Sequence, residues 1–266
     1  MGAVSDLRFP SWQDFYDSKA KKADWIEAHG WGYSAEVALS TIEDIREKLG
    51  VEPGHKLLEV GCGSGMVLNR LLAPGQIGWG VDKSESLLRS AERFGVTTGQ
   101  VRLVLGEAYP LPFPDESFDR VLCYSVFINF PTTWYACKAL EELIRVCRPG
   151  GIILVGDIYG YWQLVRARWK SQRLTLETAR ALLLLPWLRP VSWLLWPLRT
   201  VARVMRRALA GDAEVESPEL HYRLYGHRFF KRVGKRHGCL VEILQQHIEG
   251  RDKISERRFD VRMTKR

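Results

Sequence analysis

The first part of the chain carries apolar residues at the spacing of a helix. In residues 11–28 and 34–49 apolar side chains recur every three or four positions, which predicts amphipathic helices. Beyond Pro53 and Gly54 the pattern changes to short apolar runs that alternate with helical segments. The predicted strands are KLLEV, which runs into the turn GCGSG, then IGWGVD, VRLVLG, DRVLCYSV and GIILVGDI, and the predicted helices between them are MVLNRLLA, ESLLRSAERF and WYACKALEELIRVC.

The alternation stops at Tyr159 and resumes near Gly226. There HRFFKRVGKRH predicts a helix, and CLVEILQQH and the strictly alternating RFDVRMTK predict two more strands. Strands that alternate with helices indicate crossover connections and a largely parallel sheet with helices on both faces. We therefore expect an α/β fold in which the segment from about 160 to 220 is an insertion after the fifth strand.

A glycine-rich turn follows the first predicted strand. Glycines stand at Gly61, Gly63 and Gly65 in the sequence LEVGCGSG. Such a turn lets a ligand approach the backbone closely and directs the amides of the next helix toward it. The dinucleotide fingerprint needs a further glycine where the chain has Met66, which argues against a nicotinamide or flavin cofactor. A tight turn without a ligand is the alternative interpretation.

Acidic residues mark the ends of the first three predicted strands. Glu59 stands two positions before the first glycine, Asp82 closes IGWGVD, and Glu107 follows VRLVLG. A carboxylate at the end of the second strand can accept hydrogen bonds from both hydroxyls of a ribose bound over the turn. Three acids in this order indicate a ligand site rather than solubility alone.

These residues resemble a known family, the class I S-adenosylmethionine-dependent methyltransferases of the type 11 subgroup. The resemblance covers about residues 40–160 and 222–264. It implies a Rossmann-like, mostly parallel seven-stranded sheet with an antiparallel last strand and helices on both faces, to which the apolar pattern adds a helical insertion after the fifth strand. The matching segments are LLEVGCGSG at 57–65, GVD at 80–82, GEAYPLPFPDESFD at 106–119 and ELIRVCRPGG at 142–151.

The resemblance also implies the cofactor, S-adenosyl-L-methionine, and the residues that would bind it. Each part of the cofactor has its own set of binding residues. The methionine part would be held by Glu59, Gly61, Cys62, Gly63 and Gly65, the ribose by Asp82 with Lys83 beside it, and the adenine by Glu107 and Ala108, while Ser125 would lie at the methyl-donating end.

Candidate catalytic residues follow from topology. The sulfonium already makes the methyl group electrophilic, so the protein has to place a nucleophile in line with it and exclude water. Ligands lie beyond the carboxyl ends of parallel strands, which favours Asn129, Asp157 and Tyr159, with His221 as a further candidate. A capping role for Asp157 and a surface position for His221 are the alternatives. No His and Asp stand at metal-ligand spacing, so we expect no metal.

The cysteines and the N-terminus bear on the compartment. Five cysteines are scattered without CxxC pairs, which indicates reduced thiols and neither a zinc site nor a disulfide framework. The first residues contain no apolar run of signal-peptide length, and Asp6 stands where a myristoylation signal needs Ser or Thr. We therefore expect a cytoplasmic protein.

The basic charge is concentrated in the predicted insertion. The chain has a net charge of +8, yet the segment between Tyr161 and Gly211 holds ten Lys or Arg against one acid, Glu177. Five of the ten tryptophans also fall there, and its apolar pieces 181–188 and 190–198 are shorter than the roughly 20 residues of a membrane span. Tryptophan and arginine beside leucines predict contact with the inner face of an anionic membrane.

Other uses of the insertion remain open. It could be a lid over the substrate or a dimer interface, and the oligomeric state is not predicted. We expect no nucleic-acid partner, because its arginines are interleaved with a leucine-rich surface. The expected domains are the N-terminal helices, 1–50, as a lid that includes Tyr16, Trp31 and Tyr33 or as a simple packing unit, the S-adenosylmethionine-binding domain, 51–160 with 221–266, and the insertion, 161–220.

The expected function is methyl transfer from S-adenosylmethionine to a lipid or lipid-linked acceptor at the membrane surface. One alternative is a methyltransferase for a soluble small molecule or sugar, with the insertion as lid or dimer interface. A second alternative is a protein that binds S-adenosylmethionine without turnover.

Overall fold

The computed structural model describes most of the predicted cofactor-binding domain. The larger part of the predicted insertion, with its membrane-interface prediction, lies outside the described residues, as do Trp31 and Tyr33. The described residues are 12–28, 34–96, 99–159, 213–216, 221–246, 248 and 258–266.

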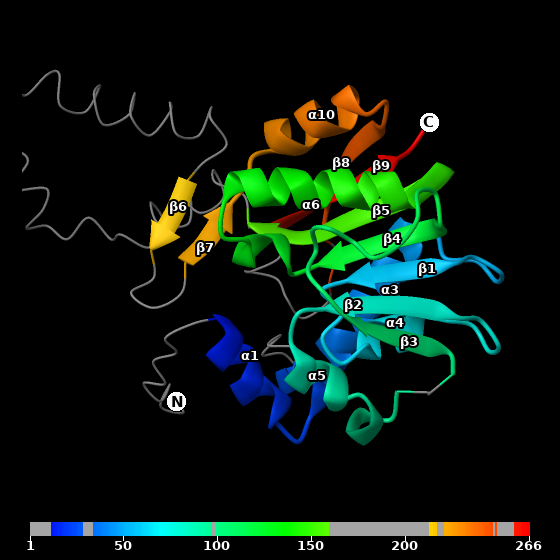
Figure 1. Ribbon diagram of the computed structural model, residues 1–266, viewed down its shortest axis with the longest axis vertical. Helices are drawn as coiled ribbons and strands as arrows, with labels where there is room; N and C mark the ends of the chain where they lie inside the picture. Colours follow the sequence, from blue (N-terminus) through cyan, green and yellow to red (C-terminus); the bar gives the residue numbers. More distant parts are fainter. Residues whose placement is uncertain are drawn as a thin grey trace, which may run out of the picture.

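A seven-stranded sheet forms the centre of the molecule, in the strand order β3-β2-β1-β4-β5-β9-β8 (Figure 1). Strands β1 to β5 pair in parallel, whereas β9 is antiparallel to both of its neighbours, β5 and β8. The last strand therefore runs opposite to all the others, which confirms the predicted fold. The strands are β1 (Leu57–Val60), β2 (Gly78–Asp82), β3 (Val101–Leu105), β4 (Phe118–Tyr124), β5 (Cys147–Tyr159), β8 (Leu240–Gln245) and β9 (Arg258–Thr264).

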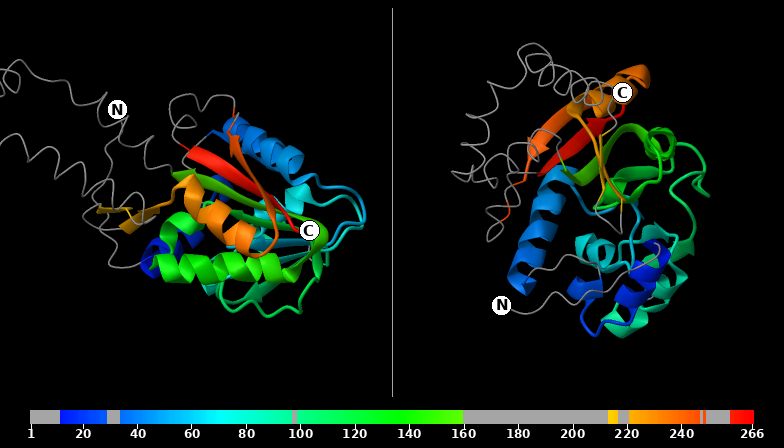
Figure 2. Two further views of the ribbon diagram at one scale, coloured as in Figure 1. Left: turned by 90° about the horizontal axis from the view of Figure 1, so that it is seen from above. Right: turned by 90° about the vertical axis from the view of Figure 1, so that its left-hand side faces the viewer.

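Helices cover both faces of the sheet because neighbouring strand residues point to opposite sides. In β4, Cys123 packs in the cluster with α6 and α10, whereas Leu122 packs in the cluster with α3 and α4. Figure 2 shows α6 and α10 on one side of the sheet and α3 on the other. The helices are α1 (Trp12–Ala20), α2 (Trp25–Ala28), α3 (Ala35–Leu49), α4 (Met66–Leu71), α5 (Glu85–Arg89), α6 (Thr133–Val146) and α10 (His227–Arg236), with 3-10 turns η1 (Glu92–Phe94) and η2 (Phe127–Asn129).

Two local features differ from the sequence prediction. The helical segment 11–28 is interrupted, and α2 starts where the Asp24 carboxylate accepts a hydrogen bond from the Ile26 N–H (2.6 Å). A two-stranded antiparallel sheet, β6 (Ala213–Glu216) and β7 (His221–Leu224), stands within and just after the expected insertion. Its strands alternate apolar and polar side chains, but each is only four residues long, which is too short a pattern to predict a strand.

A buried ion network ties α3 to the last strand. The ammonium of Lys48, a side chain only 10% exposed, lies 2.5 Å from the Asp44 carboxylate and 2.7 Å from that of Asp260. Asp260 also accepts hydrogen bonds from the Asp157 backbone N–H (2.9 Å) and from the Gln246 amide (2.9 Å). The two acids are thus held in the interior by one cation and by hydrogen bonds.

Loss of this cation is expected to destabilise the fold. The substitution Lys48→Met keeps the aliphatic stem but leaves two buried carboxylates without the ammonium, which should lower the free energy of unfolding by about 3–5 kcal/mol. Urea unfolding measures this change in the free energy of unfolding. The exposed pair Arg89–Glu85 offers the control, because Arg89→Met should leave the stability unchanged. Equal stability of the two variants would contradict the role of Lys48.

Candidate active site

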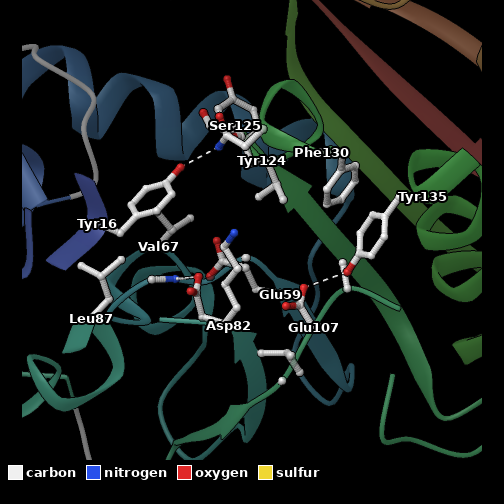
Figure 3. A pocket seen from close by; sticks show the side chains of 18 of the residues that line it. Tyr16, Glu59, Val67, Asp82, Leu87, Glu107, Tyr124, Ser125, Phe130 and Tyr135 are labelled. Carbon is white, nitrogen blue, oxygen red and sulfur yellow. Dashed lines mark hydrogen bonds between the residues drawn. The ribbon is translucent and has the colours of Figure 1, made fainter. Parts of the chain in front are cut away.

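A cavity of about 490 Å³ lies at the carboxyl ends of the parallel strands (Figure 3). The chain leaves β1 and β4, which are neighbours in the sheet, toward opposite sides, so the cavity opens where the strand order reverses. Most of the predicted site residues line it. These are Glu59, Gly61, Gly63, Asp82, Lys83, Glu107, Ala108, Ser125 and Asn129.

The glycine turn lies against the sheet at the base of this cavity. The Gly61 N–H donates to the Val81 carbonyl (2.7 Å), and the backbone of Gly61 has a φ of +77°. A Cβ at this position would lie 2.2 Å from a Val126 methyl carbon. Only glycine satisfies both constraints, which leaves backbone exposed to a ligand in the cavity.

Asp82 connects this turn to the start of α5. One carboxylate oxygen accepts a hydrogen bond from the Gly63 N–H (2.7 Å), and the other accepts one from the Ser84 N–H (2.8 Å). Burial raises the pKa of Asp82, although these hydrogen bonds and the nearby Lys83 oppose the shift. Because each carboxylate oxygen can accept more than one hydrogen bond, both remain able to bind a pair of ligand hydroxyls.

Glu59 is a second acid in the same cavity and is only 3% exposed. Its carboxylate accepts a hydrogen bond from the Leu68 N–H in α4 (3.0 Å). Burial raises the pKa of Glu59 to about 8, and the neighbouring charge of Asp82 adds to the shift. Two buried acids with raised pKa values favour a ligand that brings positive charge.

The opposite wall of the cavity is formed by Glu107, Ala108 and the first turn of α6. The Tyr135 hydroxyl donates a hydrogen bond to the Glu107 carboxylate (2.8 Å), and Figure 3 shows the pair facing the cavity. Burial and the acceptor carboxylate raise the pKa of Tyr135, so this tyrosine stays a hydrogen-bond donor at neutral pH. A flat ring can be bound between this wall and the Asp82 side of the cavity.

The third part of the cavity lies under α1. The Asn129 amide nitrogen donates to the Tyr16 hydroxyl (2.6 Å), and both side chains line the cavity. The same nitrogen lies 3.4 Å from the Ser125 carbonyl oxygen. The Asn129 carbonyl oxygen is buried and has no hydrogen-bond partner among the described residues. It can therefore accept a hydrogen bond from a ligand.

Two residues of the predicted cofactor set do not line the cavity. The Cys62 thiol is fully buried beneath the turn, and a Cβ on Gly80 would lie 2.6 Å from its sulfur. Burial raises the pKa of Cys62, so it packs as an uncharged side chain. Gly65 is the N-cap of α4 with a φ of +78°, so it shapes the turn from outside the cavity.

Three predicted catalytic residues are also absent from the lining. Asp157, only 3% exposed, accepts a hydrogen bond from the Ser125 hydroxyl (2.7 Å) and pairs with Arg258 of β9. Tyr159 interacts with the same guanidinium, which lies over its ring. Both side chains are drawn toward β9 rather than into the cavity. His221 lies in β7, outside the seven-stranded sheet.

Some lining residues escaped the sequence prediction. Phe130 and Pro131 follow the fourth strand, so their position beyond a carboxyl end was a usable signal. Tyr135 gave no such signal, because α6 brings it to Glu107 only in the folded chain.

The cavity fits the cofactor implied by the resemblance. It offers a turn that a Cβ would fill at Gly61, two buried acids and an unpartnered oxygen on Asn129. Across the described ranges, no group of three or more His, Cys, Asp or Glu could hold a metal ion. In the same ranges no helix has the length and apolar character needed to cross a bilayer.

The raised pKa of Glu59 predicts a pH dependence of stability without ligand. Unfolding returns this pKa from about 8 to about 4.3, so the folded protein binds more protons between these values and loses stability as the pH rises. The variant Glu59→Gln cannot ionise, so its melting temperature should exceed that of the wild type at pH 9 and match it near pH 4.

Thermal unfolding at the two pH values measures this difference. Glu85→Gln, at an exposed position of α5, is the control and should melt at the wild-type temperature at both pH values. A Glu59→Gln variant that is less stable than the wild type at pH 9 would contradict the expected charge burial.

Part of the chain is similar to known methyltransferases. Residues 58–155 match the family model Methyltransf_11, a methyltransferase domain. Demethylmenaquinone methyltransferase of Lysinibacillus sphaericus is 33% identical over 135 residues, which are 48% of this chain and 56% of that protein. The enzyme of the same name from Staphylococcus aureus strain JH9 is 34% identical over 113 residues, or 41% of this chain and 46% of that protein. The chain thus matches about half the length of these relatives.

Solved structures share the fold at low sequence identity. A chain from a complex with the Haloferax volcanii Trm112 methyltransferase activator aligns with a TM-score of 0.62 at 17% identity, over 96% of this chain and 97% of that one. A SAM-dependent methyltransferase of Aquifex aeolicus aligns with a TM-score of 0.54 at 16% identity, over 93% and 97%. Residues 58–155 thus match a methyltransferase domain of type 11, and the fold is shared with S-adenosylmethionine-dependent methyltransferases.

Proposed function

We propose that the protein transfers a methyl group from S-adenosylmethionine to a lipid or lipid-linked acceptor at a membrane surface. Transfer from S-adenosylmethionine is supported by two acids beside the glycine turn, the buried Glu59 and the half-buried Asp82. The acceptor class is supported by the relatives named demethylmenaquinone methyltransferase, whose name specifies a quinone.

Three sets of residues would hold the cofactor. Asp82 would accept hydrogen bonds from the ribose hydroxyls while it keeps its bonds to the backbone of the turn. Glu59, ionised at the approach of a cation, would balance the charge of the methionine part. Glu107 and Ala108 would border the adenine. When bound, S-adenosylmethionine supplies a methyl group activated by its sulfonium.

The part of the cavity under α1 would hold the acceptor. Phe130, Pro131 and Val126 give it apolar walls that suit a planar ring. The unpartnered carbonyl oxygen of Asn129 would accept a hydrogen bond from a hydroxyl or amine of that ring, and thereby orient it. Tyr16, bonded to the same side chain, would shield the reacting atoms from water.

Asp157 would act as a positioning residue. Its carboxylate holds the Ser125 hydroxyl, and both residues have positive φ values, +63° and +61°, at the ends of adjacent strands. The Arg258 guanidinium pairs with this carboxylate and holds it away from the cavity. Asp157 would therefore fix the backbone beneath the transferred methyl rather than remove a proton from the acceptor.

Transfer of a labelled methyl group tests the proposal. The full chain is incubated with methyl-labelled S-adenosylmethionine and fractionated membranes, and the label is followed into organic-soluble and water-soluble products. We expect label in a lipid-extractable product, and a loss of at least about tenfold in rate for Asp82→Ala, which removes charge-assisted hydrogen bonds.

The exposed acid Asp115 provides the matched control, since Asp115→Ala should transfer at the wild-type rate. Label only in a water-soluble product would contradict the lipid acceptor. The absence of transfer to any fraction, by a protein that binds the cofactor, would contradict the enzyme.

A further inference from the structure

The outer side of α10 presents a strip of positive charge. Its buried side is formed by Phe230, Val233 and Gly234, which face the sheet. The helix contains no acidic residue, and none of its exposed cations forms an ion pair within the described part of the chain. At 3.6 residues per turn the cations cover an arc of about 140°. They are Arg228, Lys231, Arg232, Lys235 and Arg236, which we call the α10 basic strip.

The neighbouring helix does not neutralise this strip. Helix α6 packs beside α10 on the same face of the sheet (Figures 1 and 2). Its acid Glu141 already pairs with Lys138 (2.8 Å) and with His237 just beyond α10 (3.8 Å). The strip therefore stays a net positive surface.

An exposed tryptophan lies between the helix layer of α6 and α10 and the cavity. Trp134, in the first turn of α6, is 62% exposed, and its ring contacts Tyr109 edge-on at 5.9 Å between centroids. Its sequence neighbour Tyr135 lines the cavity, and so does Pro131. One layer of the molecule thus carries a cationic helix and, at the border of the cavity, a solvent-exposed indole.

We propose that the α10 basic strip and Trp134 dock the protein on an anionic membrane. Basic side chains are attracted to the anionic lipids of a leaflet, and tryptophan prefers the boundary between headgroups and acyl chains. A single-stranded nucleic acid is disfavoured, because its bases stack on aromatic side chains and the strip itself contains none.

Docking by this layer would place the cavity mouth near lipids. The inference rests on the proposed function only for the identity of the acceptor. Vesicle binding is measured without any acceptor or cofactor, so its failure can be told apart from a failure of methyl transfer.

Cosedimentation of the full chain with vesicles tests the proposal. The vesicles contain phosphatidylglycerol and phosphatidylcholine in equal parts, with pure phosphatidylcholine as the uncharged comparison. Each basic residue near an anionic leaflet contributes about a factor of five in binding, so loss of even two contacts should weaken it about 25-fold. The test variant changes five residues to Gln, namely Arg228, Lys231, Arg232, Lys235 and Arg236.

A charge-matched variant controls for net charge. It carries five exposed cations changed to Gln on other surfaces and should bind within about threefold of the wild type, because distant charges are screened. Thermal unfolding of both variants checks that they fold. The variant Trp134→Ser tests the tryptophan contact: it should bind vesicles more weakly than the wild type, and the difference should remain at high salt. The control positions are Lys21, Lys56, Arg70, Arg89 and Arg102.

Three results would overturn the proposal. One is an α10 variant that binds vesicles as tightly as the wild type, which would assign docking to other parts of the chain. Another is an equal loss in the charge-matched variant. The third is tighter binding of the wild type to single-stranded RNA than to anionic vesicles at the same salt concentration.

Discussion

Two acids that share one cavity, Glu59 and Asp82, govern the structure around the site. Glu59 and Asp82 stand at the ends of adjacent strands, and burial raises the pKa of both. Each is held by backbone N–H groups, from Leu68 for one and from Gly63 and Ser84 for the other. The glycine turn and the first turns of α4 and α5 are arranged to supply these donors. A bound cation would stabilise the ionised form of both carboxylates.

The sheet could be predicted because its signals are local. Apolar runs of strand length, separated by helical periodicity, are enough to place β1 to β5, β8 and β9 and the helices between them. At the break between α1 and α2 the Asp24 carboxylate accepts a hydrogen bond from the Ile26 N–H, and the hairpin of β6 and β7 pairs strands of only four residues. The first feature is a local change of backbone direction and the second an alternation over too few residues, so the apolar pattern predicts neither.

The site was predictable to the extent that its residues follow directly from strand ends. Glu59, Asp82 and Glu107 reach the cavity because each closes or follows a parallel strand. The same rule applied to Asp157 gave the correct end of the sheet but not the direction of the side chain. That direction depends on Arg258, a partner 101 positions later in the chain. A local sequence pattern does not predict a partner so distant along the chain.

The central claim is that the acids at the glycine turn form the binding site of a cationic cofactor. Calorimetric titration with S-adenosylmethionine at pH 8, in buffers of low and high ionisation enthalpy, tests it most directly. A bound positive charge should lower the pKa of Glu59, so binding should release about half a proton per site to the buffer, and Glu59→Gln should abolish the release. Binding without proton release, or no binding at all, would contradict the account.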